Sequence, residues 1–544
     1  MFSAWAGDFR GMVSHQQDQN VILNVFLVTI TILFIYKLLR KSKPYAIFPV
    51  WATIEVALTS HLLLPRNGLG HHILSLLRRN NGSLFGFTSK HQVLVNLPDV
   101  DRLMSHSSRF LDATPIQYTL ITRVFGGVDT PEFKKKSDAS FMDLKGPVER
   151  LFLNETAAAA ALERACIPEH VKDFVTFSSE RRHMKRWEHS AQTKVIKTTK
   201  PGDKMKVEAN LQSLTRDFGA SIAIPQLYGS DFFERYQRVL DDLWKFDNDL
   251  FPLLMIGVPS WAPLKIVREG LAARTRLLSE IEALYKRIDQ YQNDLPVDFG
   301  ADMSDVSETA LGRNRLYAKY GWSMPERGFG DLGLLWGQNA NTQPVLFWLL
   351  AYVYSTTGVL KQIREEIDPF LGISKVTPRE LTALDIPGLS KNCQLLKACI
   401  FETYRLVNEP TSIRQVARSM TIKDGHLSHE LKPGMFVSAA LSIDNRDASV
   451  YENPDKFDPS RFLEPDPSSG KLVARYGKMK PWGSGAAICK GRTFAEKEII
   501  ALSAAIISMW DIAPANGTWE FPSMVPGTGV RKPTKDIRVV VSRR

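Results

Sequence analysis

Cysteine is scarce in this sequence, and its scarcity excludes two kinds of site. Four cysteines occur in 544 residues, namely Cys166, Cys393, Cys399 and Cys489. Their spacing fits neither a paired CxxC zinc site nor a disulfide framework. Such usage is typical of a reduced, cytosol-facing compartment. At most one of the four cysteines therefore needs a special role.

The sequence also lacks internal repeats, low-complexity tracts and, after residue 65, any linker rich in proline, glycine or serine. These absences exclude repeat arrays and favour one large domain. No flavin or nicotinamide fingerprint is present. The net charge is +11, from 69 basic and 58 acidic residues. Because no nucleic-acid motif accompanies this charge, it favours anionic lipids or an acidic protein partner rather than nucleic acid.

One long apolar run lies near the N-terminus. Residues 21–39, VILNVFLVTITILFIYKLL, predict a helix about 28 Å long, which matches a bilayer core. Basic residues follow at 40, 41 and 43, so the positive-inside rule places residues 1–20 in the lumen and the rest in the cytosol. A cleaved signal peptide would need a shorter run and a basic start. We expect a single-pass anchor in the endoplasmic reticulum membrane.

Residues 40–64 form a basic and apolar stretch that we interpret as a membrane-proximal linker. A second span is the alternative, but Pro49, Glu55 and His61 interrupt it. Residues 65–544 then form one domain that is mainly α with a small β component. The elements expected in it are a strand pair over 83–95 with its turn at 89–90, and helices over 97–106, 207–220, 235–249, 265–293 and 334–354.

The most informative run is PWGSGAAICKGRTFA, at residues 481–495, where glycines surround Cys489 and a helix-forming segment follows. Glycine lets the backbone approach a flat partner where a Cβ would collide. A cysteine just before a helix lies among unpaired N–H groups, which favour the thiolate. A thiolate of this kind suits the axial position of a haem iron. The alternative is a buried structural cysteine in a glycine turn.

This run resembles the cysteine loop of the cytochrome P-450 family. Trp482, Gly485, Cys489 and Gly491 occupy the loop's aromatic, glycine, cysteine and glycine places. The resemblance implies haem as cofactor, with Cys489 as the iron ligand. Ala487 stands where the family often has an arginine that binds a haem propionate, so another residue must take that place.

Two further segments match the family's order along the chain. FETYRL puts Glu402 and Arg405 on one helical face, and FDPSRF supplies Arg461. The resemblance implies a buried Glu402–Arg405–Arg461 cluster that supports the haem loop without acting in catalysis. NEPTSIRQ, at residues 408–415, matches the stretch that crosses the substrate pocket, and Arg414 is the candidate propionate ligand.

The run LLWGQNANTQPVLFWLLAYVY matches the family helix that crosses the oxygen side of the haem. Ala340 and Asn341 stand in place of the usual acid and threonine, and Thr342 follows. This departure resembles the sterol hydroxylase and prostacyclin synthase branch. Pro344 has no N–H for the carbonyl of Ala340, so we expect the helix to open there. The resulting polar notch would hold water and dioxygen at candidate catalytic residues 340–342; the alternative is a kink that serves packing only.

Leu335 and Trp336, one turn before the notch, and Thr528 in PGTGVRKP are the candidate substrate-pocket residues. They predict a bulky, mostly apolar substrate.

The whole pattern predicts a monooxygenase that uses O₂, with NADPH-derived electrons from a separate P-450 reductase and cytochrome b5 as a second candidate donor. The resemblance extends to fungal enzymes that oxidise terpenoid, steroid-like or other secondary metabolites, and this substrate class is an analogy. Two rivals stay open. One is a haem-thiolate isomerase or dehydratase that acts on a peroxide without a reductase, which Ala340 and Asn341 favour. The other is a haem-binding protein without turnover.

Overall fold

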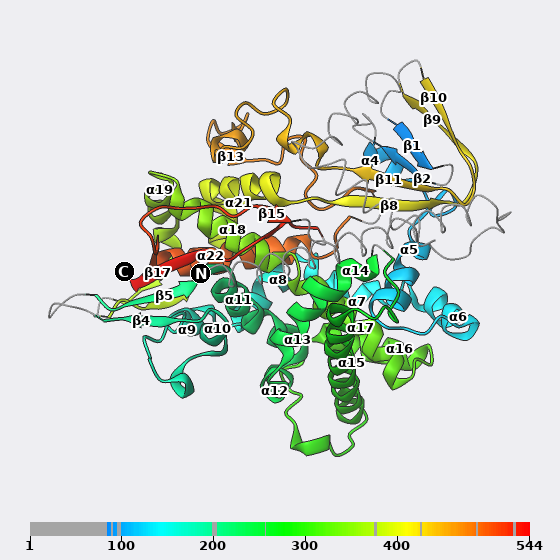
Figure 1. Ribbon diagram of the computed structural model, residues 1–544, viewed down its shortest axis with the longest axis horizontal. Coiled ribbons are helices and arrows are strands. Elements are labelled where there is room, and N and C mark those ends of the chain that lie inside the picture. Colours follow the sequence, from blue (N-terminus) through cyan, green and yellow to red (C-terminus); the bar gives the residue numbers. More distant parts are fainter. Residues whose placement is uncertain are drawn as a thin grey trace, which may run out of the picture. The chain divides into compact units, whose positions relative to one another are not determined.

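Helices supply most of the fold, and small sheets flank them (Figure 1). The computed structural model describes residues 84–88, 91–94, 100–197, 204–255, 257–374, 378–424, 427–485, 488–525 and 529–544. All of them belong to the compact unit that spans residues 47–544. The predicted mainly α fold with a small β component is confirmed.

The predicted anchor lies outside the described residues, as do residues 1–20 and 40–64. Within the part of the chain that the structure describes, no helix combines the length and the apolar character that crossing a bilayer requires. The anchor and the domain boundaries therefore stay predictions.

Helix α18, Thr342–Ser355, lies at the centre of the core, and each residue from Thr342 to Val353 is buried. A helix that is apolar on all sides is stable only when other elements enclose it. Here α11 (Leu211–Tyr228), α21 (Gln394–Val407) and α22 (Arg492–Met509) pack around α18, and Figure 1 shows it between α21 and α22.

A break separates α18 from α17, Met324–Asn339. The N–H of Ala340 still donates to the carbonyl of Trp336 at 2.8 Å, whereas the next helix starts at Thr342 with Asn341 at φ −112°. Pro344 has no N–H to offer the carbonyl of Ala340, so the regular i→i−4 bonding is interrupted at this point. The predicted opening of the helix is confirmed.

Two sheets complete the frame. The first has the strand order β1-β2-β11-β8-β3, and the second has the order β14-β17-β5-β4. The strands of the first sheet are β1 Leu84–Thr88, β2 His91–Leu94, β3 Leu111–Asp112, β8 Thr411–Val416 and β11 Phe436–Ala440. Those of the second are β4 Lys194–Ile196, β5 Lys206–Asn210, β14 Trp510–Pro514 and β17 Arg538–Arg543.

Most of the expected elements exist with shifted bounds. The strand pair over 83–95 is confirmed as β1 and β2. The helix expected from 207 is wrong at its start, because residues 206–210 form β5 against β17 before α11 begins. The helices expected over 97–106 and 235–249 shorten to α4, Val100–Met104, and to α13, Val239–Lys245, which continues as the π-helical turn η4, Phe246–Leu250.

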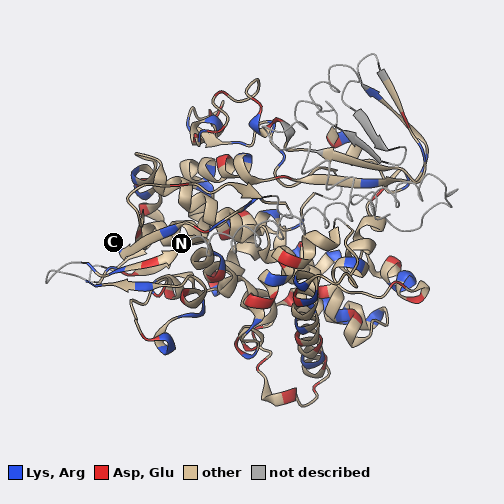
Figure 2. Ribbon diagram, viewed as in Figure 1, with Lys and Arg blue, Asp and Glu red and all other residues tan. Residues whose placement is uncertain are grey.

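The helix expected over 265–293 is confirmed as α15, Lys265–Gln292. Figure 2 shows acidic and basic residues interspersed along α15 and the helices beside it. The positive charge is therefore not gathered there into the continuous stripe that nucleic-acid binding uses.

A buried ion pair joins α21 to the segment that follows the first sheet. Glu402 and Arg405 have fully buried side chains, and both carboxylate oxygens accept from the guanidinium, at 2.7 Å each. Arg461, in the short 3₁₀ helix η8 (Pro459–Phe462), places its Nε 3.5 Å from Glu402. The N–H of Asp458 donates to the same carboxylate at 2.9 Å. The structure thus brings the three predicted cluster residues together.

Arg405 uses its remaining N–H groups on the backbone. Its Nη1 donates to the carbonyls of Asn445 and Pro454, at 2.6 and 2.7 Å, and its Nη2 donates to the carbonyl of Lys456 at 3.4 Å. A guanidinium has five N–H donors, and here all five have acceptors. The side chain therefore fixes the path of residues 445–458 over α21.

Replacing Arg405 by Leu should leave the Glu402 carboxylate buried without its main cation, which costs about 3–5 kcal/mol. We expect a large fall in the urea concentration at the unfolding midpoint. The matched control is Arg475→Leu, because Arg475 pairs with Glu464 at 3.9 Å with both side chains about half exposed, and such pairs contribute about 0–1 kcal/mol. Equal midpoints for the two variants would contradict the role given to Arg405.

Candidate active site

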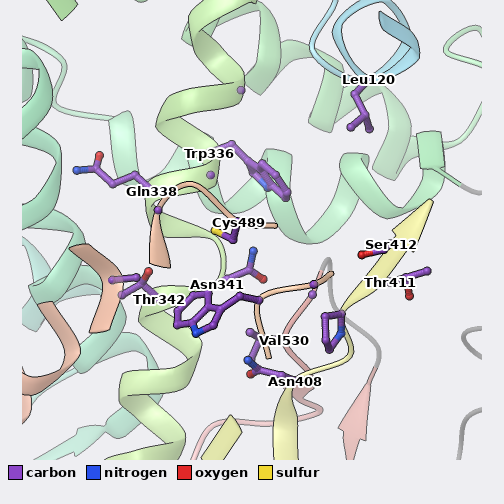
Figure 3. A pocket seen from close by; sticks show the side chains of 18 of the residues that line it. Leu120, Trp336, Gln338, Asn341, Thr342, Asn408, Thr411, Ser412, Cys489 and Val530 are labelled. Carbon is purple, nitrogen blue, oxygen red and sulfur yellow. The ribbon is translucent and has the colours of Figure 1, made fainter. Parts of the chain in front are cut away.

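A cavity of about 660 Å³ lies between the cysteine loop, the α17–α18 break and strand β8. Figure 3 shows Cys489, Asn341 and Thr342 around it, with Trp336 on α17 and Ser412 on β8. Its wall is mostly apolar, with a few polar side chains, which is the usual character of a site for a small organic molecule. The apolar side chains in the wall include Ile116, Leu120, Val148, Phe152, Phe251, Leu334, Trp336 and Val530.

The cysteine loop presents its sulfur to this cavity. The N–H of Cys489 donates to the carbonyl of Trp482 at 2.9 Å, and the N–H of Ile488 donates to the carbonyl of Gly485 at 3.0 Å. These bonds close the loop just before α22 begins at Arg492. The side chain of Cys489 is exposed, and the space that it is exposed to is the cavity.

The glycines of the cysteine loop have different surroundings. Gly485 has φ +73°, and a Cβ there would come within 2.2 Å of the carbonyl oxygen of Met104. Gly485 is therefore needed for the approach of α4, and it is absent from the cavity wall, whereas its role in cofactor binding stays a prediction. Gly483 and Gly491 do line the cavity. Ala487 lies outside the described residues.

The acidity of Cys489 reflects two opposed effects. Burial raises the pKa of the thiol, whereas the N–H groups of Gly491 and Arg492 and the charges of Arg492 and Lys490 lower it. The donors expected at the helix start are present, but burial outweighs them in the protein alone. A metal ion bound to the sulfur would deprotonate the thiol outright.

The other three cysteines have different surroundings. Cys393 and Cys399 are buried, and burial raises the pKa of Cys393 to about 12 and that of Cys399 well above its usual value. Cys166 is exposed and lies just before the short helix α9, Ile167–Val171. Among the cysteines, Cys489 is the one in the cavity wall.

Arg414 brings a positive charge to the cavity wall. Arg414 is 4% exposed, and its guanidinium donates to the carbonyls of Ile413 and Ser484, at 2.8 and 3.2 Å. Burial lowers the pKa of Arg414, and the charge of Asp112 opposes that shift. A buried cation whose hydrogen-bond acceptors are neutral carbonyls suits an anionic group of a ligand.

Trp482 is fixed beside the sulfur by neighbouring aromatic rings. Its indole N–H donates to the hydroxyl of Tyr476 at 3.0 Å, and its ring meets Tyr404 edge-on at 5.2 Å. The ring lines the cavity. With Cys489 and Arg414, it gives a soft ligand, a flat apolar surface and a cation at one site, and this donor set fits a haem with its carboxylates.

The three residues expected at the notch are placed differently. Asn341 and Thr342 line the cavity, and Oδ1 of Asn341 is buried without a hydrogen-bond partner among the described residues. Ala340 is 1% exposed and is absent from the wall. Its side chain packs into the core, and Pro344 has no N–H to donate to its carbonyl.

The predicted pocket residues need one correction. Leu335 is fully buried in the core and does not line the cavity, whereas Leu334, Trp336 and Gly337 do. The reason is helical phase: residues 334, 337 and 338 lie on one side of α17 and line the cavity, whereas residues 332, 335 and 339 are fully buried in the core. Thr528 lies outside the described residues, but Gly529 and Val530 after it line the cavity.

Sequence reasoning missed the contacts that hold Trp336. Its ring stacks on Phe251 at 4.4 Å, and its indole N–H donates to Asp247 at 2.9 Å. Asp247 also pairs with Lys532, which follows the cavity-lining segment 529–530. No local pattern links these positions, because they come from α17, from residues 247–251 and from the C-terminal region.

A second missed residue is Glu498, on α22. It is 1% exposed, lines the cavity and accepts from Nε2 of Gln343 at 3.2 Å. The sequence signal for Glu498 was its position directly before the mostly apolar run IIALSAAI, residues 499–506, which predicts that this part of the helix is buried. A charged residue beside an apolar run is common in amphipathic helices, so this pattern alone does not indicate a buried carboxylate.

Comparison with known proteins adds an independent observation. The family profile described as Cytochrome P-450 matches residues 332–541. A cytochrome P-450 monooxygenase of Gibberella zeae is 28% identical over 58% of this chain and 59% of its own length. The 25-hydroxycholesterol 7-alpha-hydroxylase of Rattus norvegicus is 29% identical over 54% of this chain and 68% of its own.

A human relative, 7-alpha-hydroxycholest-4-en-3-one 12-alpha-hydroxylase, is 28% identical over 38% of this chain and 43% of its own length. The match to the Gibberella zeae relative covers 59% of that protein, which is less than two thirds of its length. The matched region nevertheless holds the α17–α18 break, the Glu402–Arg405 pair and the cysteine loop, which are the features that build the cavity. Residues 332–541 thus match the cytochrome P-450 family, and the relatives that the chain resembles are a cytochrome P-450 monooxygenase and sterol hydroxylases.

Proposed function

We propose that this protein is a haem-dependent monooxygenase that inserts one oxygen atom of O₂ into a lipophilic substrate. The observation that carries the proposal is the shared cavity: Cys489 and the polar break at Asn341 and Thr342 line one cavity. A thiolate ligand and a polar notch are the two parts that oxygen activation at a haem needs from the protein.

The cavity residues divide the work of holding the haem. Cys489 would bind the iron, and Trp482 and Gly491 would lie against the haem ring. Arg414 would pair with a propionate, because position 487 is alanine here and not the arginine that the family often has. When bound, the haem supplies the chemistry that activates O₂. Asn341 can donate and accept hydrogen bonds but cannot titrate, so with Thr342 it would orient water and dioxygen.

The cavity wall supports a bulky apolar substrate. Rings and branched side chains line most of it, while Gln117, Gln338, Asn408 and Thr411 offer polar groups that can orient a hydroxyl or carbonyl. Two relatives are named for hydroxylation of oxidised sterols, and a third is a fungal monooxygenase. We therefore propose a sterol-like or terpenoid substrate, as in secondary metabolism.

Electrons would come from NADPH through a separate flavoprotein reductase, with cytochrome b5 as a second candidate donor. Lys480, Lys490 and Arg492 lie on or beside the cysteine loop. Lys480 pairs with Asp101, and Lys490 pairs with Glu149 at 3.2 Å. A basic surface here and a net charge of +11 would steer an acidic partner toward the haem edge.

The second candidate is a haem-thiolate isomerase or dehydratase that rearranges a peroxide. One observation favours it: residues 340–342 contain no group that titrates. Such an enzyme needs neither a reductase nor O₂.

Labelled oxygen separates the two candidates. The holoenzyme, a P-450 reductase and NADPH are incubated under ¹⁸O₂ with 25-hydroxycholesterol and with a cholestenone, and products are read by mass spectrometry. We expect one labelled oxygen per product and no product without reductase, because one atom of O₂ enters the substrate and the other leaves as water. A product formed from a sterol hydroperoxide without reductase, and free of label, would overturn the monooxygenase assignment.

We further propose that residues 21–39 anchor the protein in the endoplasmic reticulum membrane, with the catalytic domain facing the cytosol. Removing residues 1–43 should move the protein from the carbonate-resistant membrane fraction to the carbonate-extracted fraction and leave haem binding intact. The full-length chain is the control. A truncated protein that still resists carbonate would place a span elsewhere, with residues 45–64 as the first candidate.

A further inference from the structure

Trp482 connects the cysteine loop with two tyrosines. Its ring lines the cavity, and its carbonyl accepts from the N–H of Cys489 at 2.9 Å. Its indole N–H donates to the hydroxyl of Tyr476 at 3.0 Å, and the ring of Tyr404 meets its ring edge-on at 5.2 Å. Tryptophan and tyrosine lose an electron more easily than other aromatic side chains, so these contacts offer electrons a path to the cavity.

The two tyrosines differ in what can receive the hydroxyl proton. Tyr476 is partly exposed between the exposed residues Arg475 and Gly477, and its hydroxyl has no acceptor among the described residues, so water can take its proton. Tyr404 is fully buried, and its hydroxyl has no hydrogen-bond partner within the described chain. A tyrosine that loses an electron must also release this proton. Tyr476 is therefore the tyrosine that can be oxidised.

The other tryptophan in the cavity wall has no such neighbour. Trp336 donates to the buried carboxylate of Asp247, and its ring contacts in the part of the chain that the structure describes are with Phe125 and Phe251. Phenylalanine is much harder to oxidise than tyrosine. An electron taken from Trp336 therefore cannot be replaced from the rings around it, whereas one taken from Trp482 can be replaced from Tyr476.

Such a path matters because an oxidised haem can damage the protein that holds it. A haem that has reacted with peroxide in the absence of substrate keeps oxidising equivalents that no substrate consumes. The proposed iron ligand Cys489 is then at risk, because a cysteine thiolate oxidises through sulfenic acid to sulfinic and sulfonic acids, which are not readily reversed. An electron from Trp482 removes one oxidising equivalent and spares the sulfur.

We propose that Trp482 and Tyr476 form an electron-transfer path from the protein surface to the haem, which gives the protein a second activity, the reduction of peroxide by a soluble one-electron donor. The inference rests on the haem binding of the proposed function. Trp482 gives one electron to the oxidised haem. Tyr476 returns one electron to Trp482 and releases its hydroxyl proton to water, which leaves a neutral tyrosyl radical.

A donor such as ascorbate then restores the path. It returns one electron to the tyrosyl radical of Tyr476, and water returns the proton. Two such cycles supply two electrons, which together with two protons reduce one hydrogen peroxide to two waters. The haem, Trp482 and Tyr476 end each pair of cycles unchanged.

Electron paramagnetic resonance identifies the residue that holds the radical. Ferric holoenzyme without substrate is mixed rapidly with a peracid and frozen. We expect a tyrosyl radical, whose signal narrows when the protein carries ring-deuterated tyrosine. Tyr476→Phe should replace it by a tryptophanyl radical, and Trp482→Phe should remove both. Tyr404→Phe is the matched control and should keep the wild-type signal, because Tyr404 also contacts Trp482 but has no acceptor for its proton.

Bleaching of the haem tests the protective role. With hydrogen peroxide and ascorbate, Tyr476→Phe and Trp482→Phe should lose the Soret band several-fold faster than wild type and should accumulate more sulfinic and sulfonic acid at Cys489, measured by mass spectrometry. Tyr404→Phe should match wild type. Rates are compared per haem that gives the carbon monoxide band of cysteine ligation, so a variant that binds less haem is not mistaken for a damaged one.

The outcomes separate this path from the proposed function. A tyrosyl radical that persists in Tyr476→Phe would reject the path, and a tryptophanyl radical that persists in Trp482→Phe would move the electron loss to Trp336 or another tryptophan. Equal bleaching in all variants would reject the protective role. A wild-type protein without the red-shifted carbon monoxide band would instead reject the haem-thiolate site on which the proposed function depends.

Discussion

The site depends on one buried guanidinium. Arg405 places five N–H donors against the Glu402 carboxylate and three backbone carbonyls from residues 445–456. Removing such a charge from water is costly, and complete hydrogen bonding offsets that cost. The bonds fix the chain path over α21, and this path leads through η8 toward the cysteine loop. The position of Cys489 beneath the cavity therefore depends on an ion pair that does not line the cavity.

The helix break contributes the polar half of the site. The break at residues 340–341 leads directly into α18, which is buried from Thr342 to Val353, and among the described residues the side chains of Asn341 and Gln343 have oxygens without a hydrogen-bond partner. In an apolar core these atoms need water. The same break lacks a titratable group at 340–342, while Glu498 reaches the cavity from α22.

The sequence predicted the parts of this site that are local. The i,i+3 spacing of Glu402 and Arg405, the proline at 344 and the cysteine before a helix each act within a few residues, so they can be read from a pattern. The pairing of residues 206–210 with the C-terminal strand, the phase that turns Leu335 inward and the approach of Met104 to Gly485 depend on distant segments. Glu498 was missed for the same reason, since its partner Gln343 lies on another helix.

The central claim is that Cys489 binds a haem iron in the cavity, and the carbon monoxide difference spectrum of the reduced protein tests it most directly. Wild type should show the strongly red-shifted Soret band of cysteine ligation, and so should Cys166→Ser and Cys399→Ala, whose sulfurs lie away from the cavity. Cys489→His should abolish that band. A variant Cys489→His that kept the band would contradict the account.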